Sequence, residues 1–179
     1  ALSKIDKDVS NKLIFNYLKN IRKDGRLANL IGKHDSKSLE TADAHGWLFV
    51  RCLEIIKKIE KNKSLLDSTK KLIRVKMKDD SPAHVIAFLD QAQKTLNKKE
   101  DFLHHATYEI ETSLEKAIEG LLKKFTVNNL EVNNANETWM DTSFENDDRH
   151  GFRIEIQAFR LNMYRLMYDI TQDPKYKSL

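Results

Sequence analysis

Apolar residues recur at intervals of three and four along most of the chain, the spacing that one face of an α-helix requires. This pattern predicts six helices, over about residues 9–21, 44–59, 64–77, 82–96, 101–125 and 152–171. The 179-residue chain contains only 5 glycines and 2 prolines, fewer than the turns of a sheet-rich fold usually use. We therefore expect an all-α fold in which neighbouring helices run antiparallel, because most connections between them are short.

Two of the predicted connections are long for an all-helical protein, at about residues 25–43 and 126–152. Long loops on a rigid scaffold often carry functional residues. No stretch rich in proline or glycine divides the chain, so the sequence predicts a single helical domain over residues 1–179.

The charge balance points away from several kinds of partner. The formal net charge is +4 with 32% charged residues, which is too small an excess to predict nucleic-acid binding. The basic residues between 57 and 78 also lack the interleaved aromatic residues of a nucleic-acid surface. No apolar run reaches the roughly 18 residues of a membrane span, so no membrane partner is expected.

The chain has no residue pattern typical of a metal or redox site. It contains no His-Glu-x-x-His motif and no pair of cysteines, so neither a metal nor another cofactor is expected. The single cysteine, Cys52, cannot form an internal disulfide and is expected to be buried with a structural role. This cysteine usage fits a reducing compartment and a cytoplasmic protein.

The segment Glu137–Thr142 is the most typical of a catalytic site. It lies within residues 131–148, which have six carboxylates and no basic residue. The indole of Trp139 offers a flat face for a sugar ring, and a carboxyl group beside it, such as that of Asp141, can keep its proton near neutral pH. A general acid for glycoside cleavage needs that property. On chemistry alone an alternative stays open, in which Trp139 anchors the core and Asp141 caps a helix or a turn.

The same segment, together with Arg149–Ala158, resembles the glucosidase domain of glycogen debranching enzymes, the amylo-α-1,6-glucosidases. That family has a Thr-Trp-Met-Asp motif, a polar loop, and Arg-x-Gly-x-x-Val-Glu-Ile at the start of an inner helix. Residues 138–141 match the first motif, and residues 149–156 match the second with isoleucine in place of valine. Upstream, Thr41–Phe49 resembles the family's Thr-x-Asp-Ala-x-x-Trp-Phe motif, and residues 24–29 loosely resemble its Asp-Gly-Leu-Ile-Pro-Asn turn.

The resemblance covers residues 10–60 and 105–172, whereas residues 61–100 resemble nothing in the family. It implies a barrel of six inner and six outer helices, an (α/α)6 barrel, of which six helices are about half. We therefore expect a fragment of a larger glucosidase catalytic domain. The alternatives are a half completed by a second chain and a half retained without activity. The expected partners are a glucan or oligosaccharide substrate and the remainder of the parent polypeptide or a second chain.

The resemblance also implies roles for single side chains. Asp141 matches the general acid, which would protonate the leaving oxygen of an α-1,6-glucosidic branch linkage. Trp139 and Trp47 would form walls against the sugar faces, and Asp43 would accept hydrogen bonds from glucose hydroxyls. Core packing alone is the alternative for Trp47.

Glu155 and Arg149 are expected to bind substrate or to form a structural ion pair. Glu155 would either bind a sugar hydroxyl or pair with Arg149 or Arg153. The general base lies much further along in the family, and no carboxylate of this chain is a convincing base, so the isolated chain is expected to be inactive. Three departures from the family motifs bear on substrate preference: His150, the pair His45–Gly46, and Ala28.

Two other classes of function remain open at this point. The first is a noncatalytic helical carbohydrate-binding or scaffold module. The second is an unrelated helical interaction protein whose motif matches arise by chance.

Overall fold

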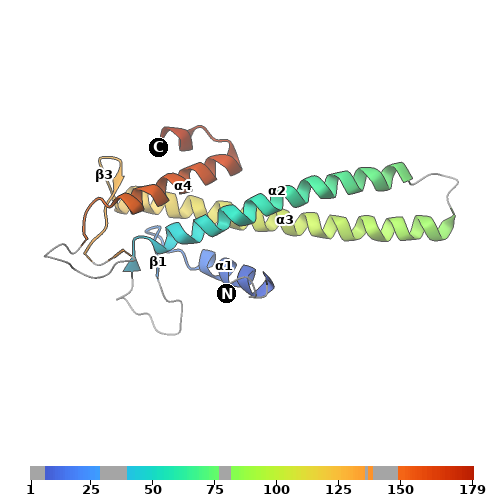
Figure 1. Cartoon of the computed structure of the whole chain (residues 1–179), viewed down its shortest axis with the longest axis horizontal. Helices are drawn as coiled ribbons and strands as arrows, with labels where there is room; N and C mark the ends of the chain where they lie inside the picture. The colour runs from blue at the N-terminus through green and yellow to red at the C-terminus, as the bar shows by residue number, and fades with distance from the viewer. Residues whose placement is uncertain (1–6, 29–39, 77–81, 136, 139–148) are drawn as a thin grey trace. The chain divides into compact units, whose positions relative to one another are not determined.

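The computed structural model describes residues 7–28, 40–76, 82–135, 137–138 and 149–179, and it is 76% helical. The predicted all-α class is therefore confirmed. The described residues form five helices: α1 (Lys7–Lys19), α2 (Ala44–Lys76), α3 (Ala83–Lys124), α4 (Ile154–Thr171) and α5 (Lys175–Ser178) (Figure 1). None of these helices has the length and apolar character needed to cross a membrane.

Two of the predicted helix boundaries are wrong. The helices expected over 44–59 and 64–77 form the single helix α2, and those expected over 82–96 and 101–125 form the single helix α3. The expected breaks, at 60–63 and 97–100, contain lysine, glutamate and asparagine but no glycine or proline. These polar residues interrupt the apolar pattern without stopping a helix, because lysine and glutamate have good helix propensity.

The chain divides into two compact units, each described here by itself. Unit 1 comprises Ala1–Leu53 and Glu109–Leu179, and unit 2 comprises Glu54–Tyr108. Unit 2 therefore contains the whole stretch, residues 61–100, that the family resemblance leaves unmatched.

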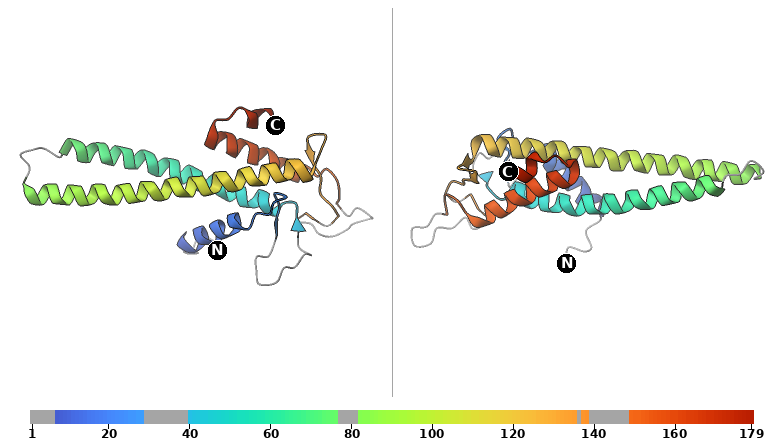
Figure 2. Two further views of the ribbon diagram at one scale, coloured as in Figure 1. Left: turned by 180° about the vertical axis from the view of Figure 1, so that it is seen from behind. Right: turned by 90° about the horizontal axis from the view of Figure 1, so that it is seen from above.

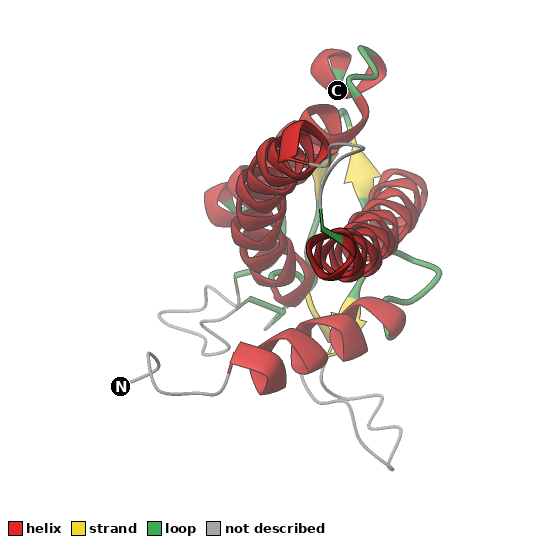
Figure 3. Ribbon diagram, turned by 90° about the vertical axis from the view of Figure 1, so that its right-hand side faces the viewer, coloured by secondary structure: helices red, strands yellow, loops and turns green. Residues whose placement is uncertain are grey.

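Unit 2 is a hairpin of two antiparallel helical segments, from α2 and α3, which run side by side in every view (Figures 2 and 3). Ile59, Leu66 and Ile73 of α2 are buried at intervals of seven residues. That interval gives the narrow apolar seam of a coiled coil. On the opposing segment the buried residues include Leu103 and Ala106.

Unit 1 has a broader core, to which every helix longer than one turn contributes. Its buried apolar residues include Leu18, Leu48, Phe49, Cys52, Ile110, Leu114, Leu121, Ile156, Met163, Met167 and Tyr176. Cys52 is completely buried, as expected, and burial raises the pKa of its thiol to about 12, so the group stays protonated and unreactive.

Two short antiparallel ladders lie in the predicted loop regions. Strand β1 (Leu27–Ala28) pairs with β2 (Glu40–Thr41), and β3 (Thr126–Val127) pairs with β4 (Leu130–Glu131). Asn128 and Asn129, the two residues between β3 and β4, have φ angles of 50° and 64°. Left-handed angles at both positions are what a tight two-residue hairpin turn requires, and asparagine adopts them more readily than most residues.

Candidate functional site

The predicted site residues that the structure describes lie at one end of unit 1. Helices α2 and α4 begin at this end and α3 finishes there, so the ladders and their connections gather around the same three helix ends (Figure 1). Strand β2 leads directly into α2, and an isolated bridge between Asn133 and Gly151 precedes α4. The upstream motif begins at the end of β2 and continues into α2. The downstream motifs lie between β4 and the start of α4.

A backbone hydrogen bond joins the two motif segments. The N–H of Ala42, in the upstream motif, donates to the carbonyl oxygen of Glu137 at 2.6 Å. Glu137 immediately precedes the Thr-Trp-Met-Asp sequence, and Ala42 immediately precedes Asp43. Residues that are far apart in sequence, and that were grouped only by resemblance, are therefore neighbours in the fold.

Arg149 and Thr138 connect the two ends of the segment that carries Trp139 and Asp141. Nε of Arg149 donates to Oγ1 of Thr138 at 3.0 Å, and the guanidinium group also pairs with the carboxylate of Glu155. Of the two predicted roles for Glu155, the structure contains the ion pair with Arg149. The backbone of Arg149 is left-handed, with φ 57°.

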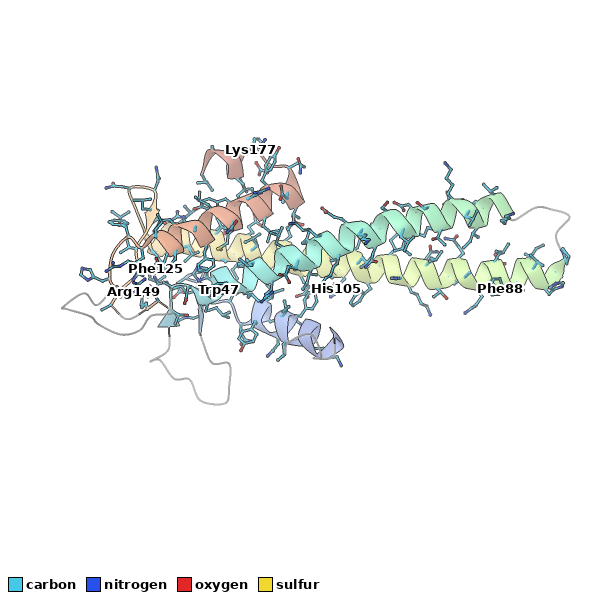
Figure 4. All side chains as sticks on the ribbon, in the orientation of Figure 1. Trp47, Phe88, His105, Phe125, Arg149 and Lys177 are labelled. Carbon is cyan, nitrogen blue, oxygen red and sulfur yellow. The ribbon has the colours of Figure 1, made fainter. Side chains whose placement is uncertain are left out.

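Trp47 presents much of its indole ring to solvent and lies near the start of α2 (Figure 4). Trp47 is 54% exposed, so it is not a core residue. Its ring centroid lies 4.8 Å from that of Phe159, and the two rings meet edge to face. Gly46 allows this contact, because a Cβ at that position would lie 2.5 Å from Cβ of Phe159. The glycine that departs from the family motif therefore permits close packing of α4 on α2.

Asp43 and Thr41 are buried where β2 joins α2. The backbone carbonyl of Asp43 accepts a hydrogen bond from the N–H of Trp47 at 3.0 Å, which closes the first turn of the helix. Asp43 is 4% exposed, so only a small part of its surface is accessible to a sugar hydroxyl.

The two residues on which the catalytic prediction depends, Asp141 and Trp139, lie outside the described residues. Thr138, which precedes Trp139 in sequence, is buried.

Sequence reasoning missed a cluster of buried polar residues with one partly buried partner, Glu137. We call it the buried polar cluster: Arg26, His45, Glu131, Glu137 and Arg160. Arg26 is its centre and is completely buried. Its Nη1 donates to Oε2 of Glu137 at 2.5 Å, its Nη2 donates to the carbonyl of Val132 at 3.0 Å, and its Cζ lies 3.5 Å from the ring centre of Phe125. The second contact partner of Glu137 is Asn134, whose backbone N–H donates to Oε2 at 2.7 Å.

His45 and Glu131 are in contact within the buried polar cluster. Nε2 of His45 lies 3.7 Å from Oε1 of Glu131. Burial, and next the charge of Arg26, lower the pKa of His45 to about 3, so the imidazole is neutral at pH 7. Burial raises the pKa of Glu131 to about 7, although Arg26 and Arg160 act in the opposite direction. The contact is therefore not a formal ion pair, since the imidazole is uncharged and the carboxyl group is partly protonated near neutral pH.

Glu131 is held by its backbone rather than by its side chain. Oε1 of Gln157 accepts from its N–H at 2.9 Å, and Nε2 of Gln157 donates to its carbonyl at 2.7 Å. Among the residues that the structure describes, no donor forms a hydrogen bond with either carboxyl oxygen of Glu131. Complete burial keeps this carboxyl group away from substrate, so we interpret the buried polar cluster as a support for the motif segments.

Two members of the buried polar cluster had a signal in the sequence. Arg160 lies four residues after Ile156 and four before Tyr164, on the buried stripe of α4. A charged residue on such a stripe predicts a buried polar contact, and its guanidinium group does donate to the hydroxyl of Tyr164. His45 lies three residues before Leu48, within the helix predicted over 44–59, whereas Glu131 stood in a polar segment with no periodicity, so its burial was not visible before the fold.

Within the described ranges, no group of three or more histidine, cysteine, aspartate or glutamate side chains is placed to hold a metal ion. No protein-family model, curated protein or solved structure matches the chain.

Proposed function

We propose that unit 1 is part of the catalytic domain of a glycoside hydrolase that cleaves α-1,6-glucosidic branch linkages of glycogen-like glucans, with Asp141 as the general acid. The observation that carries this proposal is the hydrogen bond from Ala42 to Glu137, because it joins the two motif segments that resemble glucosidases. Chance matches to unrelated motifs give no reason for the two segments to meet.

The division of the chain supports the same proposal. All the motif residues that match the family belong to unit 1, and the unmatched stretch, residues 61–100, belongs to unit 2. In unit 1 the motif segments lie where α2 and α4 begin, which agrees with a site placed at the starts of inner helices. The corresponding fold proposal is that the helices of unit 1 form part of an (α/α)6 barrel.

The roles assigned to Asp141 and Trp139 follow from the family resemblance, and those of the other residues follow also from their surroundings. Asp141 would protonate the glycosidic oxygen as the bond to the leaving sugar breaks. Trp47, with half its surface exposed, would stack on a glucose face, and Asp43 would accept a hydroxyl hydrogen bond nearby. Trp139 is assigned a second stacking surface for the sugar. Arg149 and Glu155, already paired with each other, would fix the segment between Thr138 and Arg149.

The reaction also needs a carboxylate that activates water on the opposite face of the sugar, at roughly 6.5–9.5 Å from the general acid in an inverting enzyme. No residue of this chain is assigned that role. We propose that the remainder of a parent polypeptide or a second chain supplies it.

The first test is saccharide binding by the chain, followed through tryptophan fluorescence. A trisaccharide with an α-1,6-linked glucose should quench the fluorescence, and cellotriose, a β-1,4-linked trisaccharide of the same size, should not. Trp47→Ala and Asp43→Asn should each weaken binding by about tenfold or more. Leu161→Ser, at an exposed position of α4, is the matched control. Absence of binding, or binding that Trp47→Ala leaves unchanged, would refute the proposed sugar site.

The second test is glucose release from branched oligoglucosides by the chain and by an Asp141→Asn variant. Neither should release glucose, because no base is assigned within this chain. Release by the unmodified chain that survives the substitution would rule out Asp141 as the acid.

A further inference from the structure

The two faces of the hairpin in unit 2 carry different side chains. The seam positions recur every seven residues, at 59, 66 and 73 of α2 and at 89, 96 and 103 of α3. The residues one position before these turn to one side of the hairpin, and the residues one position after them turn to the other. Because the two helical segments are antiparallel, the same offset leads to the same side on both. We call the first side the apolar-basic face: Lys58, Leu65, Leu72, Phe88, Thr95 and Phe102.

The apolar side chains of this face are well exposed. Leu65, Leu72, Phe88 and Phe102 are 59% to 72% exposed, although each is large enough to belong in a core. Phe88 lies on the part of α3 nearest its start (Figure 4). Phe88 and Phe102 are about 21 Å apart along a straight helix, since each residue adds roughly 1.5 Å. The apolar contacts would therefore follow a line rather than fill one pocket.

The acidic residues, but not the basic ones, are divided between the faces. The apolar-basic face has Lys58 and, near the end of α2, Lys76, but it has no acidic residue among residues 54–76 and 82–108. The opposite face has Glu60, Asp67 and Asp90, together with Arg74, each one position after a seam residue. Lys70 and Glu100 form an ion pair at the seam. Acidic residues are thus absent only from the side where leucine and phenylalanine are exposed.

This combination fits an anionic lipid surface better than a protein partner. The centre of a protein interface is a continuous apolar patch from which lysine is depleted. Here Thr69 separates Leu65 from Leu72 along α2, and Thr95 separates Phe88 from Phe102 along α3. Separate leucine and phenylalanine side chains flanked by lysine are typical of elements that lie flat on a membrane, where lysine interacts with anionic headgroups.

We propose that the apolar-basic face of unit 2 binds the surface of bilayers that contain anionic phospholipids, with its leucine and phenylalanine side chains entering the headgroup region. The expectation that no membrane partner exists rested on the missing spanning segment, and surface binding needs no such segment. The proposal is independent of the glucosidase function, because it depends on unit 2 alone.

The test is co-sedimentation of the full chain with two kinds of vesicle, one of phosphatidylcholine alone and one of phosphatidylcholine mixed with phosphatidylglycerol. Binding is expected only to the mixed vesicles, and it should weaken as salt is added, because salt screens exposed charges. Leu72→Ser and Phe102→Ser should each weaken binding by about five- to tenfold. Circular dichroism should show an unchanged helix content, because both side chains are exposed.

Two matched controls separate this face from net charge and from exposed apolar residues in general. Leu161→Ser, which removes a leucine that is 62% exposed in unit 1, should leave binding unchanged. Lys58→Gln with Lys76→Gln should weaken binding by at least tenfold. Lys57→Gln with Lys71→Gln, which removes the same charge from the outer side of the same helix, should have a much smaller effect.

Three results would overturn the proposal. The first is no binding to the phosphatidylglycerol vesicles at low salt. The second is an equal loss with both pairs of lysine substitutions and no effect of Phe102→Ser, which would mean binding by net charge alone. The third is a dimer, detected by light scattering without vesicles, that Phe102→Ser dissociates while vesicle binding is absent, which would assign the face to a second copy of the chain.

Discussion

The two units of this chain differ in the kinds of side chain that they bury. Unit 2 buries only apolar side chains along its seam and keeps its charges at the surface. All the buried polar or charged side chains among the described residues belong to unit 1, including Arg26, His45, Glu131 and Arg160. Unit 1 also contains all the motif residues that resemble a glucosidase.

This difference places the energetically costly burial of charge in unit 1. A buried charge costs several kcal/mol of desolvation, which its partners offset only in part. Unit 2 forms its helix pair with only apolar side chains buried, so it does not have this desolvation cost. Local rules tend to be broken at functional sites, so the buried polar cluster of unit 1 agrees with the function proposed for that unit. The predictions that follow test whether the two units differ as described, from the largest expected effect to the smallest.

Removing the central charge of unit 1 should have the largest effect. Arg26→Met should lower the free energy of unfolding by about 3–5 kcal/mol, because it leaves Glu137 without its buried cationic partner. Arg74→Met, at an exposed position of unit 2, is the control and should change it by less than about 0.5 kcal/mol. Urea unfolding followed by tryptophan fluorescence reports on unit 1, since both tryptophans belong to it. Equal effects of the two substitutions would contradict the contrast between the units.

The stability of unit 1 should depend on pH in a defined way. The folded state raises the pKa of Glu131 from 4.5 to about 7, so it binds a proton that the unfolded state loses, and this residue lowers stability as pH rises from 4.5 to 7. The folded state lowers the pKa of His45 from 6.5 to about 3, so this residue raises stability as pH rises from 3 to 6.5. The two contributions oppose each other between pH 4.5 and 6.5.

A Glu131→Gln variant should expose the histidine contribution. Relative to the unmodified chain, its stability should increase by about 3 kcal/mol between pH 4.5 and 7, because the glutamate contribution is removed. His45→Asn should have the reverse effect and make the chain less stable, relative to the unmodified chain, as pH rises toward 6.5. Urea unfolding at several pH values measures both differences. Parallel pH profiles for all three proteins would show that these groups do not titrate as described.

Two glycines of unit 1 allow crowding to be separated from backbone strain. Gly25 and Gly151 both have positive φ angles, 87° and 97°, but only Gly25 is crowded, since a Cβ there would lie 2.2 Å from the carbonyl oxygen of Ala117. A Cβ at Gly151 would meet nothing within 4 Å. Gly25→Ala should therefore cost about 1–3 kcal/mol more than Gly151→Ala in the same unfolding measurement. Equal costs would mean that the turn at Gly25 moves away from α3 at little expense.

The smallest effect is expected in unit 2. Lys70→Gln removes the ion pair with Glu100, whose carboxylate is 35% exposed. The hydrogen bond from Lys70 is the largest cause of the lowered pKa of this carboxyl group. Ion pairs that water can reach contribute little to stability, so the urea midpoint followed by far-UV circular dichroism should change little. Leu66→Ala, in the buried seam, is the positive control and should lower the midpoint clearly. A large effect of Lys70→Gln would mean that unit 2, like unit 1, depends on charged contacts.

The all-α class and most of the helices could be predicted from periodicity, and the errors in the helix boundaries have a physical cause. The helices expected over 9–21 and 152–171 correspond to α1 and α4, because their apolar stripes are wide and their ends are marked by glycine or by a change of pattern. The breaks expected inside α2 and α3 were wrong, because a coiled-coil seam needs only one apolar residue in every three or four. The adjacent residues Asn128 and Asn129 are typical of a tight hairpin turn, but the periodicity of apolar residues does not predict the turn between β3 and β4.

The candidate site could be predicted only in part. The ion pair between Arg149 and Glu155 was one of two alternatives considered, and the exposure of Trp47 excludes core packing as its only role. The buried polar cluster was missed, because a glutamate in a polar segment, such as Glu131, looks solvated until the fold covers it. Placing Glu131 against His45 requires β4 and the start of α2 to meet, which no local pattern encodes.

The sequence by itself determined that the chain is helical, that two loop regions interrupt the helices, and which side chains have chemistry suited to a sugar site. Those properties depend on spacing and residue type within a few turns of chain. Only the tertiary structure decided that Ala42 meets Glu137, that Arg26, Glu131 and Arg160 are buried together, and that the hairpin of unit 2 has one face without acidic residues. Each of these results depends on contacts between residues distant in sequence, and such contacts form only when the helices pack.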